Sequence, residues 1–267
     1  MGMDVRRWNR EAWDRKVAAK VVWARPVDAA SIARARQGDW NIILTPLKAV
    51  PRSWLGDVKD REVLCLAGAG GQQAPVLSAA GARVTVLDNS PAMLELDRQV
   101  ASRDGLDLKT VLGDMADLSP FASDSFDLIL HPVSNCFVPQ VRPVWRESFR
   151  VLRPGGKLLS GFMNPVAYIF DHQLAEDTGK LRVRYPLPYA DERDLPEDRK
   201  QRLMDEGEAF EFSHTLEDQL AGQLEAGFVL TGFYEDSFPA DAGDALTRFT
   251  PTMLATCAWK PPAGCHG

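Results

Sequence analysis

Cysteine is scarce in this chain, and its spacing argues against the structures that cysteine usually builds. The sequence has 267 residues and only four cysteines, which are widely spaced and form no CxxC pair. A disulfide framework or a zinc site is therefore not expected, and we predict no metal centre. Reduced thiols are typical of the cytosol. The four cysteines are Cys65, Cys136, Cys257 and Cys265.

The sequence also lacks long apolar runs and clusters of basic residues. No apolar stretch is long enough to span a bilayer, and residues 1–16 are charged rather than leader-like. The formal net charge is −6, with no Lys/Arg stripe that could follow a phosphate backbone. We therefore expect a cytoplasmic protein that partners neither nucleic acid nor membrane. Its 45% hydrophobic and 25% charged residues are typical of a globular domain.

The most informative segment is an apolar strand followed by five small residues. Residues 63–66 are apolar, and residues 67–71 are all alanine or glycine. A buried parallel strand reads as an apolar run, and a turn of small residues lets the backbone approach a ligand closely. A helix over residues 72–80 and a second strand follow, and that strand ends at Asp88. This is half of a nucleotide-binding βαβ unit, in which Asp88 is placed to bind ribose hydroxyls.

A dinucleotide such as NAD is one cofactor that could use this geometry, and another nucleoside-containing cofactor is the alternative. A dinucleotide fingerprint would begin at Gly68 and Gly70, but the third glycine, which lets helix and strand pack closely, is replaced by Gln73. The residues therefore favour another nucleoside-containing cofactor over NAD.

Strands and helices alternate along the rest of the chain, and this alternation predicts a doubly wound α/β fold. Ser90 caps the helix after the second strand, and a helix follows the fourth strand. A polar, proline-containing insertion interrupts the pattern at about residues 164–213, and we expect it to shape the substrate site. The last two strands have no long helix between them and form an antiparallel hairpin. The expected strands are residues 63–66, 82–87, 106–112, 126–130, 157–162, 228–234 and 252–259.

The expected domain organisation has two parts. Residues 1–58 form a helical N-terminal extension that is rich in tryptophan. Either it packs on the core for burial alone, or it covers the carboxyl ends of the strands as a lid. Residues 59–267 form the α/β domain, with the insertion at about 164–213 as a cap.

Several motifs, in order, resemble those of the class I S-adenosylmethionine-dependent methyltransferases, with a type-11-like methyltransferase domain. Ala67, Ala69 and Gly71 occupy the glycine places of the first motif, and Cys65 replaces its usual acid. Residues 84–90 resemble the second motif, and residues 112–115 resemble the loop that reads adenine. The resemblance covers about residues 60–260. It implies a mostly parallel, seven-stranded Rossmann-like sheet with a C-terminal antiparallel hairpin, and S-adenosyl-L-methionine as cofactor.

The resemblance also implies roles for single residues. Asp88 accepts both ribose hydroxyls, Asp114 accepts from the adenine amino group, and the backbone of Met115 donates to the ring. Met93 either covers one face of the adenine or belongs to the core. Gln72 and Gln73 either bind the cofactor carboxylate or are solvated. The expected cofactor-binding residues are Ala67, Gly68, Ala69, Gly71, Gln72, Gln73, Asp88, Asn89, Met93, Gly113, Asp114, Met115 and His131.

The expected catalytic residue is His131, at the end of the fourth strand. A histidine that titrates near neutral pH could deprotonate the acceptor, or it could only orient the loop or contact the cofactor. Asn135 and Cys136 could position an acceptor, whereas His172 and His214 are weaker candidates. The motif of DNA amino-methyltransferases is absent after this strand, because its place reads His131-Pro132-Val133.

The sequence thus predicts a methyltransferase that passes the methyl group of S-adenosylmethionine to a small-molecule nucleophile and releases S-adenosylhomocysteine. One alternative is a regulator that binds the cofactor without catalysis. A weaker one is a nicotinamide-dependent oxidoreductase, which Gln73 and the final hairpin oppose. The acceptor atom, O, N, S or C, and the oligomeric state stay open at this point.

Overall fold

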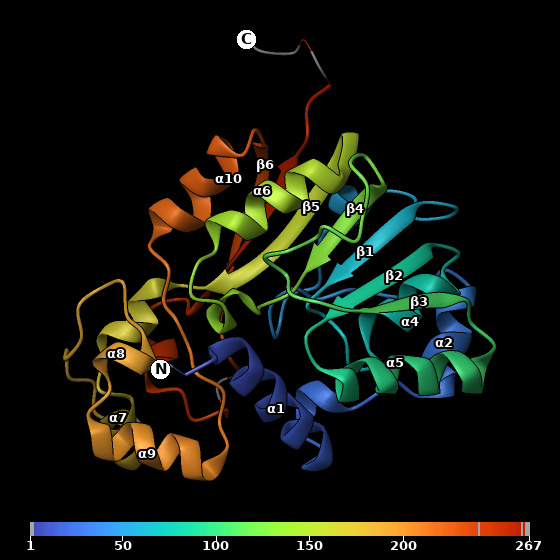
Figure 1. Cartoon of the computed structure of the whole chain (residues 1–267). Helices are drawn as coiled ribbons and strands as arrows, with labels where there is room; N and C mark the ends of the chain where they lie inside the picture. The colour runs from blue at the N-terminus through green and yellow to red at the C-terminus, as the bar shows by residue number, and fades with distance from the viewer. Residues whose placement is uncertain (1–2, 240, 263, 265–267) are drawn as a thin grey trace.

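The protein is built on one seven-stranded sheet with helices on both faces, as seen in the computed structural model (Figure 1). The structure describes residues 3–239, 241–262 and 264. The strand order is β3-β2-β1-β4-β5-β7-β6, in which β7 runs antiparallel to both neighbours and the other pairs are parallel. The predicted fold class is therefore confirmed. The strands are β1 (Glu62–Leu66), β2 (Arg83–Asp88), β3 (Leu108–Leu112), β4 (Phe126–His131), β5 (Leu152–Met163), β6 (Val229–Asp236) and β7 (Met253–Trp259).

Alternating side chains of the strands build two apolar cores, one on each face of the sheet. Leu64 and Ile129 face the core that contains Trp145, whereas Cys65 and Leu130 face the opposite core. Both cores are needed because parallel strands are buried on both faces. The first core is covered by α6 (Arg142–Val151), η4 (Glu217–Ala221) and α10 (Gly222–Glu225), and the second by α2 (Ala29–Arg36), α3 (Arg52–Leu55), α4 (Gln73–Ala79) and α5 (Pro91–Asp104).

The N-terminal segment crosses the carboxyl ends of the strands. Its first helix, α1 (Val5–Ala18), begins at an Asp4 cap and lies in Figure 1 beyond the tips of β1 and β2. Ser90 Oγ, at the start of α5, donates to Asp14 Oδ1 at 2.6 Å. A 3-10 turn, η1 (Val22–Ala24), then leads the chain to α2, which is capped by the Asp28 side chain.

The insertion after β5 is folded and packs beside α1 (Figure 1). Asn9 of α1 binds the backbone near the end of the insertion. Its Nδ2 donates to the Phe210 carbonyl at 3.0 Å, and the Phe210 N–H donates to its Oδ1 at 2.8 Å. The same amide donates to the Phe137 carbonyl at 3.1 Å. The helical elements of the insertion are η3 (Pro165–Ile169), α7 (His172–Thr178), α8 (Asp191–Asp194) and α9 (Glu197–Glu206).

Some local expectations differ from the structure. The expected fifth strand over residues 157–162 is longer, because β5 begins at Leu152, which pairs with Phe126, and continues through residues 153–156. Before β6, residues 217–225 form a π-helical turn, η4, joined to the short α10. Trp145 Nε1 donates to the Asp218 carbonyl there, at 2.9 Å. A four-residue 3-10 turn, η5 (Ala245–Arg248), lies between β6 and β7.

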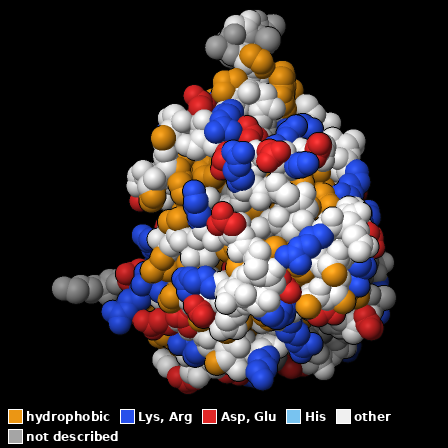
Figure 2. All heavy atoms as spheres, turned by 90° about the vertical axis from the view of Figure 1, so that its right-hand side faces the viewer, with side chains coloured by type: hydrophobic (Ala, Val, Ile, Leu, Met, Phe, Trp, Pro, Cys, Tyr) orange, Lys and Arg blue, Asp and Glu red, His pale blue; other side chains and the backbone are white. Residues whose placement is uncertain are grey.

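The surface and the thiols agree with the composition. Figure 2 shows acidic and basic side chains interspersed on the face over β3 and α5. Cys65, Cys136 and Cys257 are buried free thiols, and Cys265 lies outside the described residues. Within the described part of the chain, no cluster of side chains could hold a metal ion. Of the helices seen there, none is both long and apolar enough to cross a membrane.

Candidate functional site

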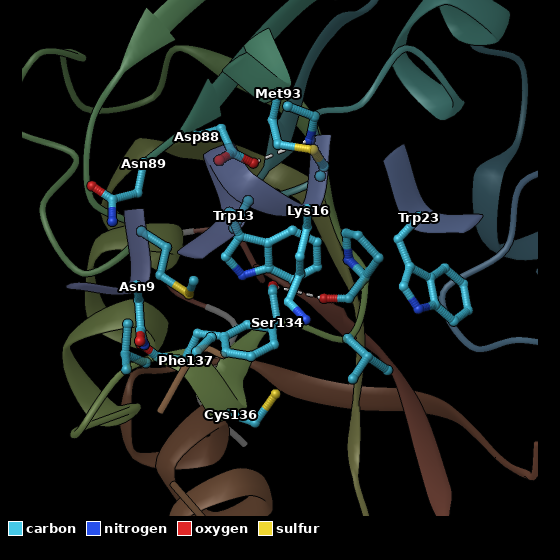
Figure 3. Close-up of a pocket in the computed structure, with 18 of the residues that line it drawn as sticks. Asn9, Trp13, Lys16, Trp23, Asp88, Asn89, Met93, Ser134, Cys136 and Phe137 are labelled. Atoms are coloured by element: carbon cyan, nitrogen blue, oxygen red, sulfur yellow. Dashed lines mark hydrogen bonds between the residues drawn. The ribbon is translucent and has the colours of Figure 1, made fainter. Parts of the chain in front are cut away.

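A cavity of about 520 Å³ opens at the carboxyl edge of the sheet. This is where ligands bind in open α/β folds, and the volume lies within the usual range of small-molecule sites. Figure 3 shows Asp88 and Met93 at one end, Cys136 and Phe137 at the other, and Trp13 between them. The wall combines the turns after β1 to β4 and the end of β5 with residues from α1, η1, the 43–46 loop, residues 208–211 and Phe238.

Asp88 is held in place by two backbone N–H groups. Oδ1 accepts from Ser90 at 2.9 Å and Oδ2 accepts from Ala69 at 3.2 Å, so the carboxylate is fixed while its side chain still lines the cavity. Burial raises its pKa to about 6, partly offset by these N–H donors, while nearby Asp14 also raises it. A carboxylate that is oriented and only partly solvated can accept two neighbouring hydroxyl donors.

The small-residue turn after β1 brings the backbone to the cavity. Ala67, Gly68 and Ala69 line it, and Ala67 has a φ of +47°, in the left-handed region that favours glycine. Gly70 has a φ of +118°, and a Cβ there would lie 2.8 Å from the Trp23 carbonyl oxygen. Glycine is therefore required where the N-terminal segment crosses the turn.

A buried carboxylate that was not predicted from the sequence holds this turn by accepting a backbone hydrogen bond. Asp97, on α5, is fully buried, and its Oδ2 accepts from the Gly70 N–H at 2.9 Å. Its Oδ1 has no hydrogen-bond partner among the described residues. Burial raises the pKa of Asp97 to about 7, against the lowering effect of the turn's N–H groups. Asp97 is thus a buried carboxylate that holds the turn following Cys65.

Two predicted residues at the turn contact the N-terminal segment. Gln72 Nε2 donates to the carbonyls of Val22 and Arg25, at 3.0 and 3.1 Å, and Gln73 Oε1 accepts from the Ile43 N–H at 3.0 Å. Both side chains also line the cavity. One amide atom of each side chain is therefore bound to backbone groups of the chain itself.

Two predicted glycines lie behind the wall rather than in it. The Gly71 carbonyl accepts from the Val27 N–H at 2.8 Å, so Gly71 joins the turn to the N-terminal segment. The Gly113 N–H donates to the Asp88 carbonyl at 2.9 Å and joins two strand ends. Neither residue belongs to the cavity lining. Each is better described as supporting the neighbours that do line it.

The remaining predicted cofactor residues converge on the Asp88 end. Asn89, Met93, Asp114 and Met115 all line the cavity, and Figure 3 shows Asn89 and Met93 flanking Asp88. Asn89 Nδ2 donates to the Arg6 carbonyl at 2.9 Å, and Arg6 Nε lies 3.4 Å from Asp114 Oδ2. The helix α1 therefore reaches the side chains expected to bind the nucleoside.

His131 is not in the cavity, which corrects its expected role. Its side chain is fully buried, its Nδ1 donates to the Leu66 carbonyl at 2.9 Å, and its Nε2 contacts the Asn135 side chain. Its ring lies 6.0 Å from that of Trp145, under α6, and burial lowers its pKa. The cause is strand alternation: His131 points to the face opposite Leu130. His131 is therefore placed to hold the loop after β4 and does not face the cavity.

Of the four other candidates, Asn135, Cys136, His172 and His214, only Cys136 lines the cavity. Asn135 is buried, and its Nδ2 donates to Gln219 Oε1 at 3.0 Å. His214 Nε2 lies 3.0 Å from the Asn135 carbonyl, so both residues belong to the support under this loop. His172 packs near Tyr168 and Tyr189 in the insertion, with ring centroids 6.0 and 6.4 Å away, outside the cavity wall.

The end of the cavity away from Asp88 contains residues that the sequence analysis did not select. Phe137, Val138, Met163 and Phe238 give it apolar walls, and Lys16 and Glu211 add charge. Regular spacing along α1 was the available signal for Trp13 and Lys16. For Glu211 there was none, because it lies in an irregular segment of the insertion.

Sequence comparisons place the chain among methyltransferases. A family profile described as a methyltransferase domain matches residues 64–160. A Bacillus subtilis (strain 168) protein named as an uncharacterized methyltransferase, YbaJ, is 50% identical over 252 residues, covering 94% of this chain and 97% of that protein. A demethylmenaquinone methyltransferase of Tropheryma whipplei (strain Twist) is 30% identical over 136 residues, covering 50% of this chain and 53% of the relative.

Solved structures share the fold. An S-adenosylmethionine-dependent methyltransferase from Mesorhizobium loti matches with a TM-score of 0.58 and 20% identity, covering 78% of this chain and 94% of that one. The geranyl diphosphate C-methyltransferase of Streptomyces coelicolor A3(2), in complex with Mg²⁺, geranyl diphosphate and S-adenosyl-L-homocysteine, matches with a TM-score of 0.58 and 14% identity. That match covers 97% of this chain and 99% of the neighbour.

Proposed function

Since the chain belongs to the S-adenosylmethionine-dependent methyltransferases, we propose that it methylates a small molecule held at the Cys136 end of its cavity. S-adenosyl-L-methionine is its cofactor. The observation that carries the proposal is the single cavity that extends from Asp88 to Phe137 (Figure 3). It is walled on the acceptor side by α1 and by the insertion, so a macromolecular acceptor would have to displace both. Partial relatives named as sterol and demethylmenaquinone methyltransferases also support a small acceptor.

The residues at the Asp88 end suit a nucleoside with a charged tail. Asp88 would accept the two ribose hydroxyls, Asp114 would accept from the adenine amino group, and Met93 would lie against a ring face. The turn at Gly68 and Ala69 would let the tail approach the backbone. Asp88 fits this role because backbone N–H groups already orient its carboxylate before any ligand arrives.

The protein's own work in methyl transfer is alignment and exclusion of water. The bound cofactor supplies an electrophilic methyl group, so the chain must hold the acceptor in line with it in a dry site. The apolar side chains of Trp13, Phe137 and Met163 would exclude water around the acceptor. We further propose that α1 and the insertion act together as a lid over this site.

The test is methyl transfer from methyl-labelled S-adenosylmethionine to a protein-free small-molecule extract. The matched control is Asp88→Ala, which should lose cofactor affinity while the fold survives. Label in small molecules with the wild type, and not with the variant, supports the proposal. Calorimetry with S-adenosylhomocysteine separates the alternatives. Tight binding without any transfer would identify a cofactor-binding regulator, and transfer only to added protein or RNA would exclude the small-molecule acceptor.

A further inference from the structure

Glu211 and Glu208 are two carboxylates of the insertion that line the cavity, and Glu211 is held in place by two neighbouring residues, Tyr168 and Asp191. Its side chain lines the cavity, and its Oε2 accepts from the Tyr168 hydroxyl at 2.7 Å. Its backbone N–H donates to Asp191 Oδ2 at 2.6 Å, and the Asp191 N–H donates back to its carbonyl at 3.0 Å. This is the kind of support that holds a reacting group in one geometry.

The residues behind Glu211 form a second layer that fixes this support. Tyr168 and Tyr189 are buried and stack with centroids 5.8 Å apart, and Tyr189 donates to Asp191 Oδ1 at 2.6 Å. The Phe212 N–H donates to the Cys136 carbonyl at 2.7 Å, so Glu211 lies beside the cavity residue Cys136. Residues from η3, α8 and the loop after β4 thus converge on one carboxylate.

We propose that Glu211 is the base that removes the acceptor's proton, and that the acceptor is a weakly acidic hydroxyl on an apolar body. This inference rests on the proposed function and deepens it. Glu211 is a catalytic residue in this scheme, because its carboxylate touches the reacting O–H group. It takes the role first expected of His131, whose ring is fully buried beside Trp145 and does not line the cavity.

The step balances without a further reagent. The acceptor O–H bond breaks, and its proton passes to the Glu211 carboxylate. The electron pair left on oxygen forms the new bond to the methyl carbon, and the carbon–sulfur bond breaks with its pair going to sulfur. The products are a methyl ether, S-adenosylhomocysteine and a protonated Glu211, which then loses its proton to water.

The charges around Glu211 suit a base that works near neutral pH. Burial, together with the charges of Asp191 and Glu208, raises the pKa of Glu211 to about 7. The Tyr168 hydrogen bond and the charge of Lys16 act in the opposite direction. Cys136 faces the same cluster, and burial raises the pKa of its thiol, so the thiol stays protonated.

The other groups at this end suit a hydroxyl acceptor on an apolar body. Lys16 and Glu208 both line the cavity and pair with each other, so the Lys16 cation is already matched by a carboxylate. In the proposed reaction the Lys16 ammonium stabilises the developing oxyanion. Phe137, Val138 and Met163 match an apolar body.

The first test compares Glu211→Gln with the wild type in the labelled-extract assay. The glutamine keeps an oxygen for Tyr168 but cannot take a proton, so the transfer rate should fall by about 10²–10⁴. The affinity for S-adenosylhomocysteine should stay within a few-fold, which also shows that the variant folds. The matched control is Glu206→Gln, an exposed residue of α9 paired with Arg202, which should transfer at the wild-type rate.

The second test uses Tyr168→Phe, which keeps the carboxylate and removes its donor. The wild-type rate should fall as the pH drops below about 7, because a protonated Glu211 cannot accept a proton. Without the tyrosine the carboxylate is harder to ionise, so this fall should begin at higher pH. A purely structural role of the tyrosine would lower the rate without moving the profile.

The outcomes separate this inference from the proposed function. A Glu211→Gln variant that transfers label normally, or an unchanged pH profile in Tyr168→Phe, would overturn the base role alone. Label recovered on nitrogen or carbon rather than on oxygen would overturn the hydroxyl acceptor. If the wild type transfers no label to the extract, the proposed function fails, and the inference fails with it.

Discussion

Asp88 and Asp97 are two carboxylates whose pKa values are raised by burial and which meet the same turn. Asp88 accepts from Ala69 and faces the cavity, whereas Asp97 accepts from Gly70 and is fully enclosed. Both carboxyl groups change their charge near neutral pH. Each therefore makes a different property of the molecule depend on pH. We predict that this property is cofactor affinity for Asp88 and stability for Asp97.

Cofactor affinity should fall in acid because Asp88 must be ionised to accept both ribose hydroxyls. Burial raises the pKa of Asp88 to about 6. The affinity for S-adenosylhomocysteine should therefore be constant near pH 8 and should fall as the pH drops through about 6. Asp88→Asn should bind more weakly by about 1.5–3 kcal/mol, the scale of a hydrogen bond to a charged group. Calorimetry from pH 5 to 8 measures both effects. Equal affinity of the wild type at pH 5 and pH 8 would remove Asp88 from the binding site, and any slope that persists in Asp88→Asn belongs to another group.

Asp97 should cost stability at neutral pH. Its pKa is raised to about 7 in the folded protein, above its unfolded value, so folding favours the protonated form. Its contribution is therefore fully present below the unfolded pKa and is lost as the pH rises toward 7. Asp97→Asn keeps an oxygen for the Gly70 N–H and removes the charge. We expect the variant to be more stable than the wild type at pH 7 in urea unfolding.

The advantage of Asp97→Asn should shrink as the pH falls toward 4, because the wild-type carboxyl is then protonated as well. Ser78→Ala, on the exposed side of α4, serves as a variant without a buried charge. A stability difference that does not change with pH would show that Asp97 does not titrate in this range.

At the scale of elements, the turn between β1 and α4 stores a local strain. Ala67 holds a left-handed φ of +47°, which costs an L-residue about 1–2 kcal/mol. A glycine there avoids this cost but loses about 0.5–1 kcal/mol through its greater freedom in the unfolded chain. Ala67→Gly should therefore stabilise the protein slightly, by about 0.5 kcal/mol. Denaturant unfolding measures this difference.

The neighbouring Ala69 is the matched control for that substitution. It is not among the described residues with positive φ, so Ala69→Gly gains nothing from relief of strain. It should destabilise by about 0.5–1 kcal/mol. If both substitutions destabilise equally, the left-handed conformation of Ala67 does not hold in solution.

In strand β4, a shift of one position along the strand decides which face of the sheet a side chain enters. Leu130 and His131 are adjacent, but their side chains enter different cores, and the carboxyl edge is reached only by the residues that follow. Pro132, Val133 and Ser134 line the cavity there. A residue at the end of a strand is therefore close to the site in sequence, while its side chain can be shielded from it by the sheet itself.

At the scale of the whole molecule, α1 and the end of the insertion are joined above the cavity. Trp8 Nε1 donates to the Glu208 carbonyl at 2.8 Å, Arg15 donates to the Gly207 carbonyl, and Asn9 pairs with Phe210. These contacts connect residues about two hundred positions apart. They support a lid that moves as one unit rather than two independent flaps.

Hydrogen exchange tests this lid. When S-adenosylhomocysteine binds, amides in α1 and in residues 207–212 should exchange more slowly, because closure protects both segments. Asn9→Ala removes three hydrogen bonds and should speed exchange at residues 207–212 without cofactor, while the amides of β6 stay unchanged as an internal control. Slowing confined to the β1–α4 turn and the loop at Asp114 would contradict a lid.

The sequence by itself determined the sheet and the family, and it predicted which residues meet at the Asp88 end of the cavity. Strand patterns, the small-residue turn and the distance to Asp88 depend on local spacing, and local spacing can be read along the chain. The two-part organisation, with residues 1–58 as a lid and about 164–213 as a cap, stays a prediction that the contacts of α1 support.

Only the tertiary structure decided what lies around the reacting groups. Asp97 reaches the turn from the next helix, Glu211 reaches the acceptor end from the insertion, and His131 faces away. None of these placements has a local signature, because each depends on how distant segments pack against one another. Burial, which sets the pKa values of Asp88, Asp97 and Glu211, arises in the same way.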